Sequence, residues 1–329
     1  MVRQILFGVP VVLGRTNDGK AFALRDICPH RGAPLSAGRI TEDGCVECPY
    51  HGWQFRFNDG GCNKIPALSA TDSFESAGIA VQTFPLYEAN GLIWIFNGNA
   101  KSNGGNKGIG SNALAPEIGL PASYTPKNIT TVTASGPYDE AVIGLVDPAH
   151  TPFVHKQWWW REGSAPQEKT KQFEATALGF RMPPHRPSSN SRIYGFLGGT
   201  PTTEIEFRLP GLRLETIRNR QHIILGLTTI TPNDSNQNTI THIWFWDIKA
   251  LTILKPLIKT MAKNFLAQDG AILDAQNKNL NRQAHRPLYA GEPDIPAQWY
   301  YKLKKSWGQQ QDTEDFCNPL SNQTLHWRT

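Results

Sequence analysis

Two short segments of the sequence each combine a cysteine with a histidine, and a glycine follows closely after each histidine. The first segment, CPHRG, carries Cys28 and His30, and the second, CPYHG, carries Cys48 and His51. Together they form the pattern C-x-H-x17-C-x2-H. Thiolates are soft ligands that suit zinc and iron–sulfur clusters, and imidazole suits iron and zinc. The spacing therefore predicts one metal centre held between two turns.

Two kinds of centre fit these four residues. A Rieske [2Fe–2S] cluster has two cysteines on one iron and two histidines on the other. A structural zinc site can use the same ligand types, but zinc fingers usually pair cysteine with cysteine and histidine with histidine. Gly32 and Gly52 follow the histidines, where the backbone must come close to a buried inorganic core. The mixed pairs favour the Rieske cluster, with zinc as the alternative.

A second group of possible ligands lies in the segment DPAHTPFVH, which contains Asp147, His150 and His155. On a regular helix His150 and His155 would point about 140° apart, because a helix has 3.6 residues per turn. They could bind one metal only if the helix ends or distorts between them, and Pro152 is placed to interrupt it. The segment therefore predicts a metal-binding loop. Two histidines with one carboxylate hold iron on one face and leave positions open for O2 and a substrate.

The two motifs, in this order, resemble the Rieske non-heme iron oxygenases, the terminal oxygenase α subunits. The resemblance rests on CPHRGAPLSAGRI and CPYHGWQF and extends from about residue 5 to the tail. Only 27 residues precede Cys28, which is short for this family and would fit a truncated start. Respiratory Rieske proteins carry an extra disulfide between their ligand loops. Here the corresponding residues are Ala33 and Tyr50, so that bridge is not expected.

The resemblance also implies a third ligand for the mononuclear iron. In the family this carboxylate lies on a long helix near the C-terminus, which corresponds here to NFLAQDGAILDAQN at 264–277. The match assigns the role to Asp269. Asp274 is the rival, because it lies five residues further along the same segment and would point to a different side of the helix.

Asp147 has a separate role by the same resemblance. An aspartate at this position links the first iron-binding histidine, here His150, to a cluster histidine of a neighbouring subunit, here His51. A carboxylate that accepts both imidazole N–H groups would fix their tautomers and give electrons a short route. The alternative role is an N-cap before Pro148, which is a common use of an Asp-Pro pair.

The function implied by the resemblance is that of a terminal oxygenase. A ferredoxin or flavin reductase would supply electrons to the cluster, and Fe(II) would use O2 to hydroxylate or demethylate an apolar, cyclic organic molecule in a homotrimer. The alternative is a non-enzymatic Rieske electron carrier fused to a domain that binds an apolar ligand without catalytic iron. No G-x-G-x-x-G pattern follows a predicted strand, so NAD(P)H is expected to act only through a separate reductase.

The pattern of elements predicts an α+β protein. Short β-branched and aromatic runs separated by turns fill the first hundred residues and predict a small all-β Rieske domain, residues 1–100. A linker is expected at 101–118, where glycine and asparagine are frequent. The catalytic domain, 119–329, is predicted to be helix-grip-like, with an antiparallel sheet built from three strands over 204–249, which turn near Pro210-Gly211 and at TPNDSNQN. A long helix is expected from Leu257 to Asn281. The tail from 284 is expected to wrap the surface.

Composition excludes several other classes. The net charge of +5 comes from scattered residues, and the one dense run, KLKK at 302–305, fits a solvated face better than a nucleic-acid site. No apolar stretch is long enough to span a membrane, and no secretory signal is visible. Five cysteines, an odd number, favour a reducing compartment, so the cytoplasm is expected. Three of them are interpreted as ordinary side chains: Cys45, Cys62 and Cys317.

The remaining aromatic and histidine residues have weaker assignments. Trp158–Trp160 could line a pocket or pack at a domain or subunit boundary, and packing is favoured because tryptophan is large and usually well buried. The other histidines lack neighbours of ligand type and are interpreted as structural or exposed, and they are His185, His222, His242, His285 and His326. The strands around 225–246 are expected to shape the pocket through their inward-facing residues.

Overall fold

The computed structural model describes residues 1–69, 71–96, 116–121, 123–155, 167–187, 200–282, 287–309 and 316–329. The chain divides into two compact units, Met1–Thr125 and Pro126–Thr329. Of the linker predicted at 101–118, only the last residues, 116–118, are described, so the predicted boundaries stay a prediction. Within the described ranges, no helix combines the length and apolar character needed to cross a membrane.

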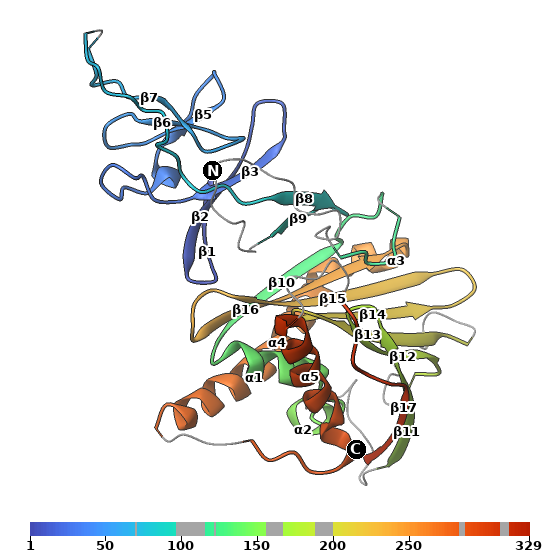
Figure 1. The fold of residues 1–329 in the computed structure, drawn as a ribbon. Coiled ribbons are helices and arrows are strands. Elements are labelled where there is room, and N and C mark those ends of the chain that lie inside the picture. Colours follow the sequence, from blue (N-terminus) through green and yellow to red (C-terminus); the bar gives the residue numbers. More distant parts are fainter. Residues whose placement is uncertain are drawn as a thin grey trace. The chain divides into compact units, whose positions relative to one another are not determined.

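The N-terminal unit is built from short antiparallel strands, as predicted (Figure 1). They form sheets β1-β2-β3, β4-β5-β6-β7 and β8-β9. The first two strands turn at Phe7 and Gly8, which both have positive φ, the conformation of a tight hairpin turn. The bounds are β1 Val2–Leu6, β2 Val9–Arg15, β3 Ala21–Arg25, β4 Arg39–Ile40, β5 Cys45–Glu47, β6 Gln54–Arg56, β7 Cys62–Lys64, β8 Leu86–Ala89 and β9 Leu92–Ile95.

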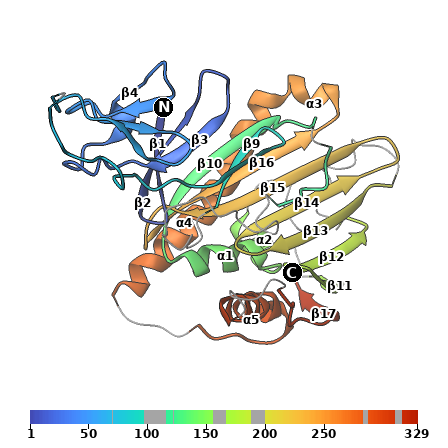
Figure 2. The same ribbon diagram turned by 45° about the horizontal axis from the view of Figure 1, so that its top comes forward.

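The C-terminal unit is built on one eight-stranded antiparallel sheet, with the strand order β10-β16-β15-β14-β13-β12-β11-β17 (Figure 2). The sequence predicted three strands over 204–249 with a turn near Pro210-Gly211; the turn is confirmed, but it divides the first run into the hairpin β13-β14. The bounds are β10 Asn128–Ser135, β11 Glu168–Thr176, β12 Gly179–His185, β13 Thr202–Arg208, β14 Leu212–Arg218, β15 Ile223–Pro232, β16 Gln237–Trp246 and β17 Gln323–Arg328.

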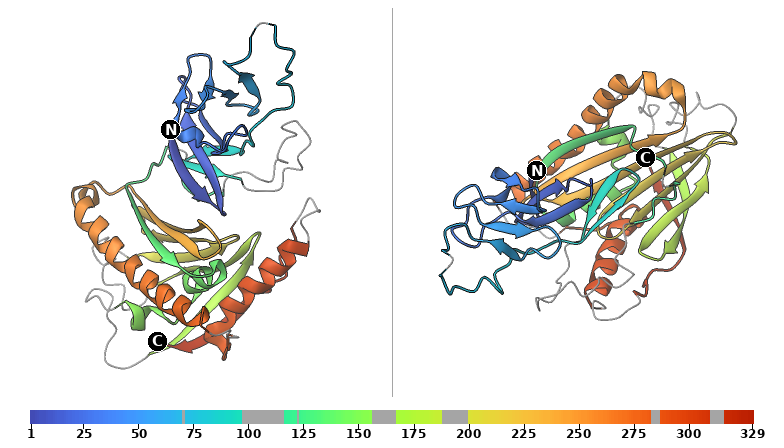
Figure 3. Two further views of the ribbon diagram at one scale, coloured as in Figure 1. Left: turned by 90° about the vertical axis from the view of Figure 1, so that its left-hand side faces the viewer. Right: turned by 90° about the horizontal axis from the view of Figure 1, so that it is seen from above.

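Helices cover one face of this sheet and enclose the main core (Figure 3). The helices are α1 Tyr138–Val146, α2 Thr151–Val154, α3 Lys249–Ile253, α4 Lys255–Leu280 and α5 Ile295–Gln309. The long helix predicted at 257–281 is thus confirmed as α4. Its buried residues recur every three or four positions, so one face packs on the sheet, and they are Leu266, Gly270, Leu273 and Asn277.

The position of α1 is fixed by a polar contact with α5. Tyr300 is almost fully buried, and its hydroxyl donates a hydrogen bond of 2.6 Å to Asp139 Oδ1. Lys304 Nζ donates to both oxygens of the same carboxylate, at 2.6 and 2.7 Å. These contacts hold the helix that leads into the second predicted metal motif.

The prediction for the tail was wrong. It was expected to wrap the surface, but it contributes the helix α5 and the edge strand β17, which pairs with β11. Leu325 and Trp327 of β17 are buried in the core beside Trp299 and Leu303 of α5. Proline and aromatic residues in the tail obscured the spacing of these apolar residues, whose burial depends on pairing with the distant strand β11. The α+β fold class itself is confirmed.

Candidate functional site

The two Cys/His segments of the N-terminal unit form loops with the same backbone geometry. In both loops the cysteine N–H donates to the carbonyl five residues further on, at 2.8 Å. The glycine four residues after each cysteine donates back to the cysteine carbonyl, at 2.8 Å for Gly32 and 3.1 Å for Gly52. Both glycines have a φ near +70° that other residues rarely adopt. Sequence segments that look alike therefore fold alike and present their side chains to a common space.

The predicted cluster ligands lie together in the fold. Cys28 and Cys48 are 1% and 3% exposed, and neither forms a disulfide. The rings of His30 and His51 have centroids 4.6 Å apart, and His30 stacks on Trp53. Burial, together with the neighbouring Cys48, raises the pKa of the Cys28 thiol to about 11. A thiolate here therefore needs a nearby cation, which a metal would supply.

The donor set fits a Rieske cluster. Two sulfurs and two imidazoles come from two matched loops, as a cluster with two cysteines on one iron and two histidines on the other requires. Nδ1 of His30 is buried and has no hydrogen-bond partner among the described residues. An unpartnered buried nitrogen is costly unless a ligand occupies it. The chemistry of this loop pair thus points to a bound metal centre.

The second motif lies in the C-terminal unit, where α1 ends. Asp147 is the C-cap of α1 and has extended backbone dihedrals, because the residue before a proline avoids the helical region. His150 then caps the start of the short helix α2, and His155 caps its end. Their ring centroids lie 5.5 Å apart. The predicted break between the two histidines was wrong: α1 already ends at Val146, before Pro148, and α2 spans the residues between His150 and His155. Pro152 lies in the first turn of α2 and does not interrupt a helix.

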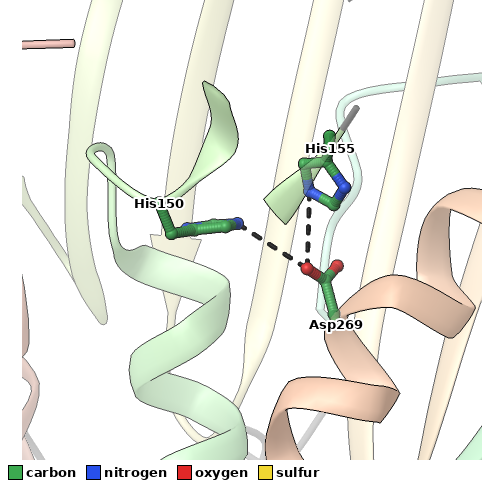
Figure 4. A group of neighbouring side chains, drawn as sticks. All are labelled: His150, His155 and Asp269. Carbon is green, nitrogen blue, oxygen red and sulfur yellow. Dashed lines mark ion pairs between the residues drawn. The ribbon is translucent and has the colours of Figure 1, made fainter. Parts of the chain in front are cut away.

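Asp269 of α4 faces both histidines (Figure 4). Its Oδ1 lies 3.4 Å from His155 Nε2 and 3.8 Å from His150 Nε2. One ligand atom from each of the three residues falls within 4.8 Å of the others, a spacing that could hold one metal ion. The rival Asp274 accepts a hydrogen bond of 2.6 Å from the backbone N–H of Ser135. The geometry therefore favours Asp269.

Hydrogen bonds to the Nδ1 atoms of His150 and His155 fix both rings so that each Nε2 points toward Asp269. His155 Nδ1 lies 3.1 Å from Gln268 Oε1, and His150 Nδ1 lies 3.0 Å from the carbonyl oxygen of Asp147. Because both acceptors are oxygens, each Nδ1 carries the proton and each Nε2 keeps a lone pair for a metal. His155 also stacks on Phe265, with ring centroids 3.5 Å apart.

Burial perturbs the titration of all three residues. It raises the pKa of Asp269 to about 6 and lowers the pKa of His155 to about 4. Burial also lowers the pKa of His150, but the hydrogen bond and charge of Asp147 outweigh it, so the net shift is upward. An anionic carboxylate beside two neutral imidazoles is costly here without a cation. The set fits a divalent iron, which would compensate that charge.

Asp147 itself does not cap a helix N-terminus, so that alternative was wrong. Its Oδ1 accepts a hydrogen bond of 2.7 Å from the Ala149 N–H, and its Oδ2 lies 3.6 Å from His150 Nδ1. The side chain is 32% exposed. The carboxylate is therefore close to His150 and also open to an outside group, and the predicted bridge to His51 of a neighbouring subunit stays a prediction.

Comparison with known families decides the identity of the two units. Residues 1–85 match the Rieske [2Fe-2S] domain, and residues 144–292 match the vanillate O-demethylase oxygenase C-terminal domain. The chain belongs to the Rieske non-heme iron oxygenase family. Members of this family carry a Rieske cluster and a mononuclear iron and typically take electrons from a separate reductase. Both centres have a matching donor set in this Rieske oxygenase.

Curated relatives are similar over part of their length. Chlorophyllide a oxygenase of Chlamydomonas reinhardtii is 34% identical over 161 residues, which is 49% of this chain and 23% of the relative. Pheophorbide a oxygenase of Oryza sativa subsp. japonica is 32% identical over 185 residues, 54% of this chain and 34% of the relative. The chain thus spans about a third or less of the length of these relatives.

Solved structures are similar over nearly the whole chain. NdmA of Pseudomonas putida CBB5, as a QL mutant with theobromine, has a TM-score of 0.68 at 18% identity and covers 94% of this chain and 85% of its own. Dicamba monooxygenase bound to 3,6-dichlorosalicylic acid has a TM-score of 0.67 at 22% identity and covers 95% and 94%. These likenesses show that the Rieske oxygenase fold extends through both units.

The C-terminal unit encloses a cavity of about 550 Å³ between the sheet and the helices. The volume is in the range of pockets that bind small organic molecules. The three candidate iron ligands line it, and apolar residues form much of the remaining wall, including Met182, Ile205, Ile230, Ile240 and Trp244. The prediction that strands near 225–246 shape the pocket is confirmed.

Sequence reasoning gave no binding role to several polar residues of this cavity, and it interpreted His185 and His242 as structural or exposed. His185, His242, Arg213 and Lys171 all line it, and each comes from a different strand. The pairing of neighbouring strands is the signal that could have found them. Arg213 of β14 pairs with Thr228 of β15, and Thr228 pairs with His242 of β16, so the three side chains lie on the same face of the sheet. The predictions for Trp158–Trp160 and His285 fall outside the described residues.

Proposed function

We propose that this chain is the terminal component of a Rieske oxygenase that uses O2 to hydroxylate or demethylate an apolar, cyclic organic molecule. The observation that supports the proposal most is the group His150, His155 and Asp269, which opens onto a cavity of about 550 Å³. A protein that only carried electrons would need neither these ligands nor their outer hydrogen bonds.

The roles of the residues follow from their contacts. Cys28, His30, Cys48 and His51 hold the [2Fe–2S] cluster, and His150, His155 and Asp269 hold the iron on one face. Iron bound in this way supplies the activation of O2 beside a bound substrate. The apolar wall of the cavity excludes water and orients the substrate.

Asp147 connects the two metal sites in this proposal. Its carboxylate lies 3.6 Å from His150 Nδ1 and is partly exposed, so it can also accept an N–H from His51 of a neighbouring subunit. Such a bridge requires an oligomer, and a homotrimer is the state that the family resemblance implies. A ferredoxin or flavin reductase would supply the electrons. Five cysteines, an odd number, favour a reducing compartment such as the cytoplasm.

A single turnover tests the oxygenase function. Protein reduced without oxygen is mixed with oxygenated buffer, and cluster oxidation is followed by absorbance. We expect Asp269→Ala to keep its cluster but to be oxidised at least about tenfold more slowly than the wild type, because it lacks an iron ligand. Asp274→Asn is the matched control on the same helix, since asparagine can still accept the Ser135 N–H. Equal rates in Asp269→Ala and wild type would refute the proposal.

A second variant tests the bridge. Asp147→Ala should retain the iron of both sites but lose transfer between them, because no carboxylate then connects the imidazoles. The measurements are iron content and the rate of cluster oxidation in the same sample. Retained iron with a wild-type rate would remove Asp147 from the electron route.

A further inference from the structure

One wall of the cavity carries lysine side chains. Lys169 and Lys171 lie two residues apart on β11, so they project from the same face of the sheet, and both line the cavity. His185, on the neighbouring strand β12, lines the same wall. The candidate iron ligands come from α4 and the loops around α2, on the helical side of the same cavity. The cavity thus has a cationic region in addition to its metal site.

Among the described residues, Lys171 lies on this wall without a counter-charge. It is half-buried, and its side chain forms no hydrogen bond or ion pair with any residue of the described ranges. Arg213, another cation of the cavity, already donates to Glu215 at 3.0 Å. Lysine is rarely buried without a partner, because the charged group loses hydration. A ligand that brought a negative charge would replace the lost water.

The pKa shifts of Lys171 and His185 are consistent with a cationic site. Burial lowers the pKa of Lys171, and repulsion from Lys169 lowers it further. Burial also lowers the pKa of His185, and Lys171 adds to that shift while Glu215 opposes it. Glu215, the carboxylate that opposes the shift of His185, forms an ion pair with Arg213. An anion bound here would stabilise the lysine ammonium.

The rest of the cavity is suited to an apolar body. Its wall includes Ile205, Ile230, Ile240 and Trp244, which lie on the strands between β12 and the edge of the sheet at β10. A ligand held by its charge at Lys171 would extend across this surface toward the three iron ligands. Such a ligand combines a hydrophobic skeleton with a charged end.

We propose that the substrate of this oxygenase is an apolar molecule that carries a carboxylate, which Lys171 binds at the β11 side of the cavity. This inference rests on the proposed function and deepens it, because it assigns a charged substrate class and a specificity residue. Lys171 binds and orients the ligand and takes no part in the chemistry.

Matched acid and amide probes test the proposal. The probes are 2-naphthoate with 2-naphthamide and biphenyl-4-carboxylate with its amide, and each pair differs in charge far more than in shape. Binding to the full, metal-loaded chain is measured by calorimetry without oxygen. We expect the carboxylates to bind at least about tenfold more tightly than the amides, as a hydrogen bond to a charged group would give.

Variants identify the residue responsible. Lys171→Met should weaken carboxylate binding about tenfold and change amide binding by less than about twofold, whereas Lys171→Arg should preserve the preference. Lys259→Met is the matched control, because Lys259 is an exposed lysine of α4 outside the cavity. Iron content is measured in every sample.

Three results would overturn the inference: equal affinity for acid and amide, a preference that survives Lys171→Met, or no binding of either probe pair. With the mononuclear iron present, any of them would reject the carboxylate assignment alone. Carboxylate binding through Lys171 in a chain without that iron would instead support the acid-binding cavity and reject the oxygenase function.

Discussion

The hydrogen bond from His155 Nδ1 to Gln268 decides which ring nitrogen can bind a metal. Gln268→Leu would remove the acceptor and leave a buried N–H unpaired. Loss of such an outer contact typically costs about 10- to 100-fold in metal affinity. We therefore expect Gln268→Leu to lose the mononuclear iron during dialysis against a chelator, while the Rieske cluster stays intact. Metal analysis before and after dialysis measures the effect.

Gln268→Glu is the control for that prediction, because glutamate keeps an oxygen acceptor at the same position. It should retain iron at or above the wild-type level. Iron loss that is equal in both variants would mean that the size of the side chain, and not its acceptor, controls the site.

His242 gives a prediction for pH. Burial lowers its pKa to about 4, from 6.5 for an ordinary histidine, and Arg213 adds to the shift. Between these two pH values the unfolded chain binds a proton at this residue that the folded chain does not, so stability falls as the pH decreases. At pH 5 the loss relative to pH 7 is about 2 kcal/mol. The midpoint of unfolding in denaturant at both pH values measures it.

His242→Gln should remove this part of the pH dependence, since glutamine does not titrate and can still bond to Thr228. The comparison is between the drop from pH 7 to pH 5 in the variant and in the wild type. An identical drop in both would show that His242 is not kept neutral by the fold.

At the scale of elements, the two cluster loops allow a matched test of how much a side chain at the loop glycine destabilises the fold. Gly32 and Gly52 both have a positive φ, but a Cβ added at Gly32 would meet nothing within 4 Å, whereas one at Gly52 would lie 3.0 Å from Pro66 Cγ. Gly32→Ala should therefore cost about 1 kcal/mol of backbone strain, and Gly52→Ala more. The guanidinium concentration at which the cluster absorbance is lost measures the destabilisation in each variant. A larger loss of stability in Gly32→Ala than in Gly52→Ala would contradict the prediction.

The elements also show what sequence reasoning could reach. The α4 helix was predicted because its apolar residues follow the helical period over 26 residues. A helix break between His150 and His155 was wrongly predicted at Pro152, because a pattern does not show that α1 already ends before Pro148. The strand β17 was missed because its burial depends on pairing with β11, far away in the sequence. Local periodicity is visible in a sequence, but distant pairing is not.

At the scale of the whole molecule, the candidate metal ligands could be predicted from the sequence, whereas the residues on the strand side of the cavity could not. Cys28, His30, Cys48 and His51 lie in compact motifs, so spacing alone identified them. Asp269 required a family resemblance, since it lies more than a hundred residues from His150. Lys171 and His242 had no local signal, because only the register of the sheet brings them to one cavity.

The central claim is that one chain holds two separate iron centres. Iron and acid-labile sulfide, measured on the purified chain, test it most directly. We predict about three iron atoms and about two sulfides per chain in the wild type, from one cluster and one mononuclear site. Asp269→Ala should contain about two iron atoms and unchanged sulfide. Two iron atoms in both proteins, or zinc in place of iron and no sulfide, would contradict the account.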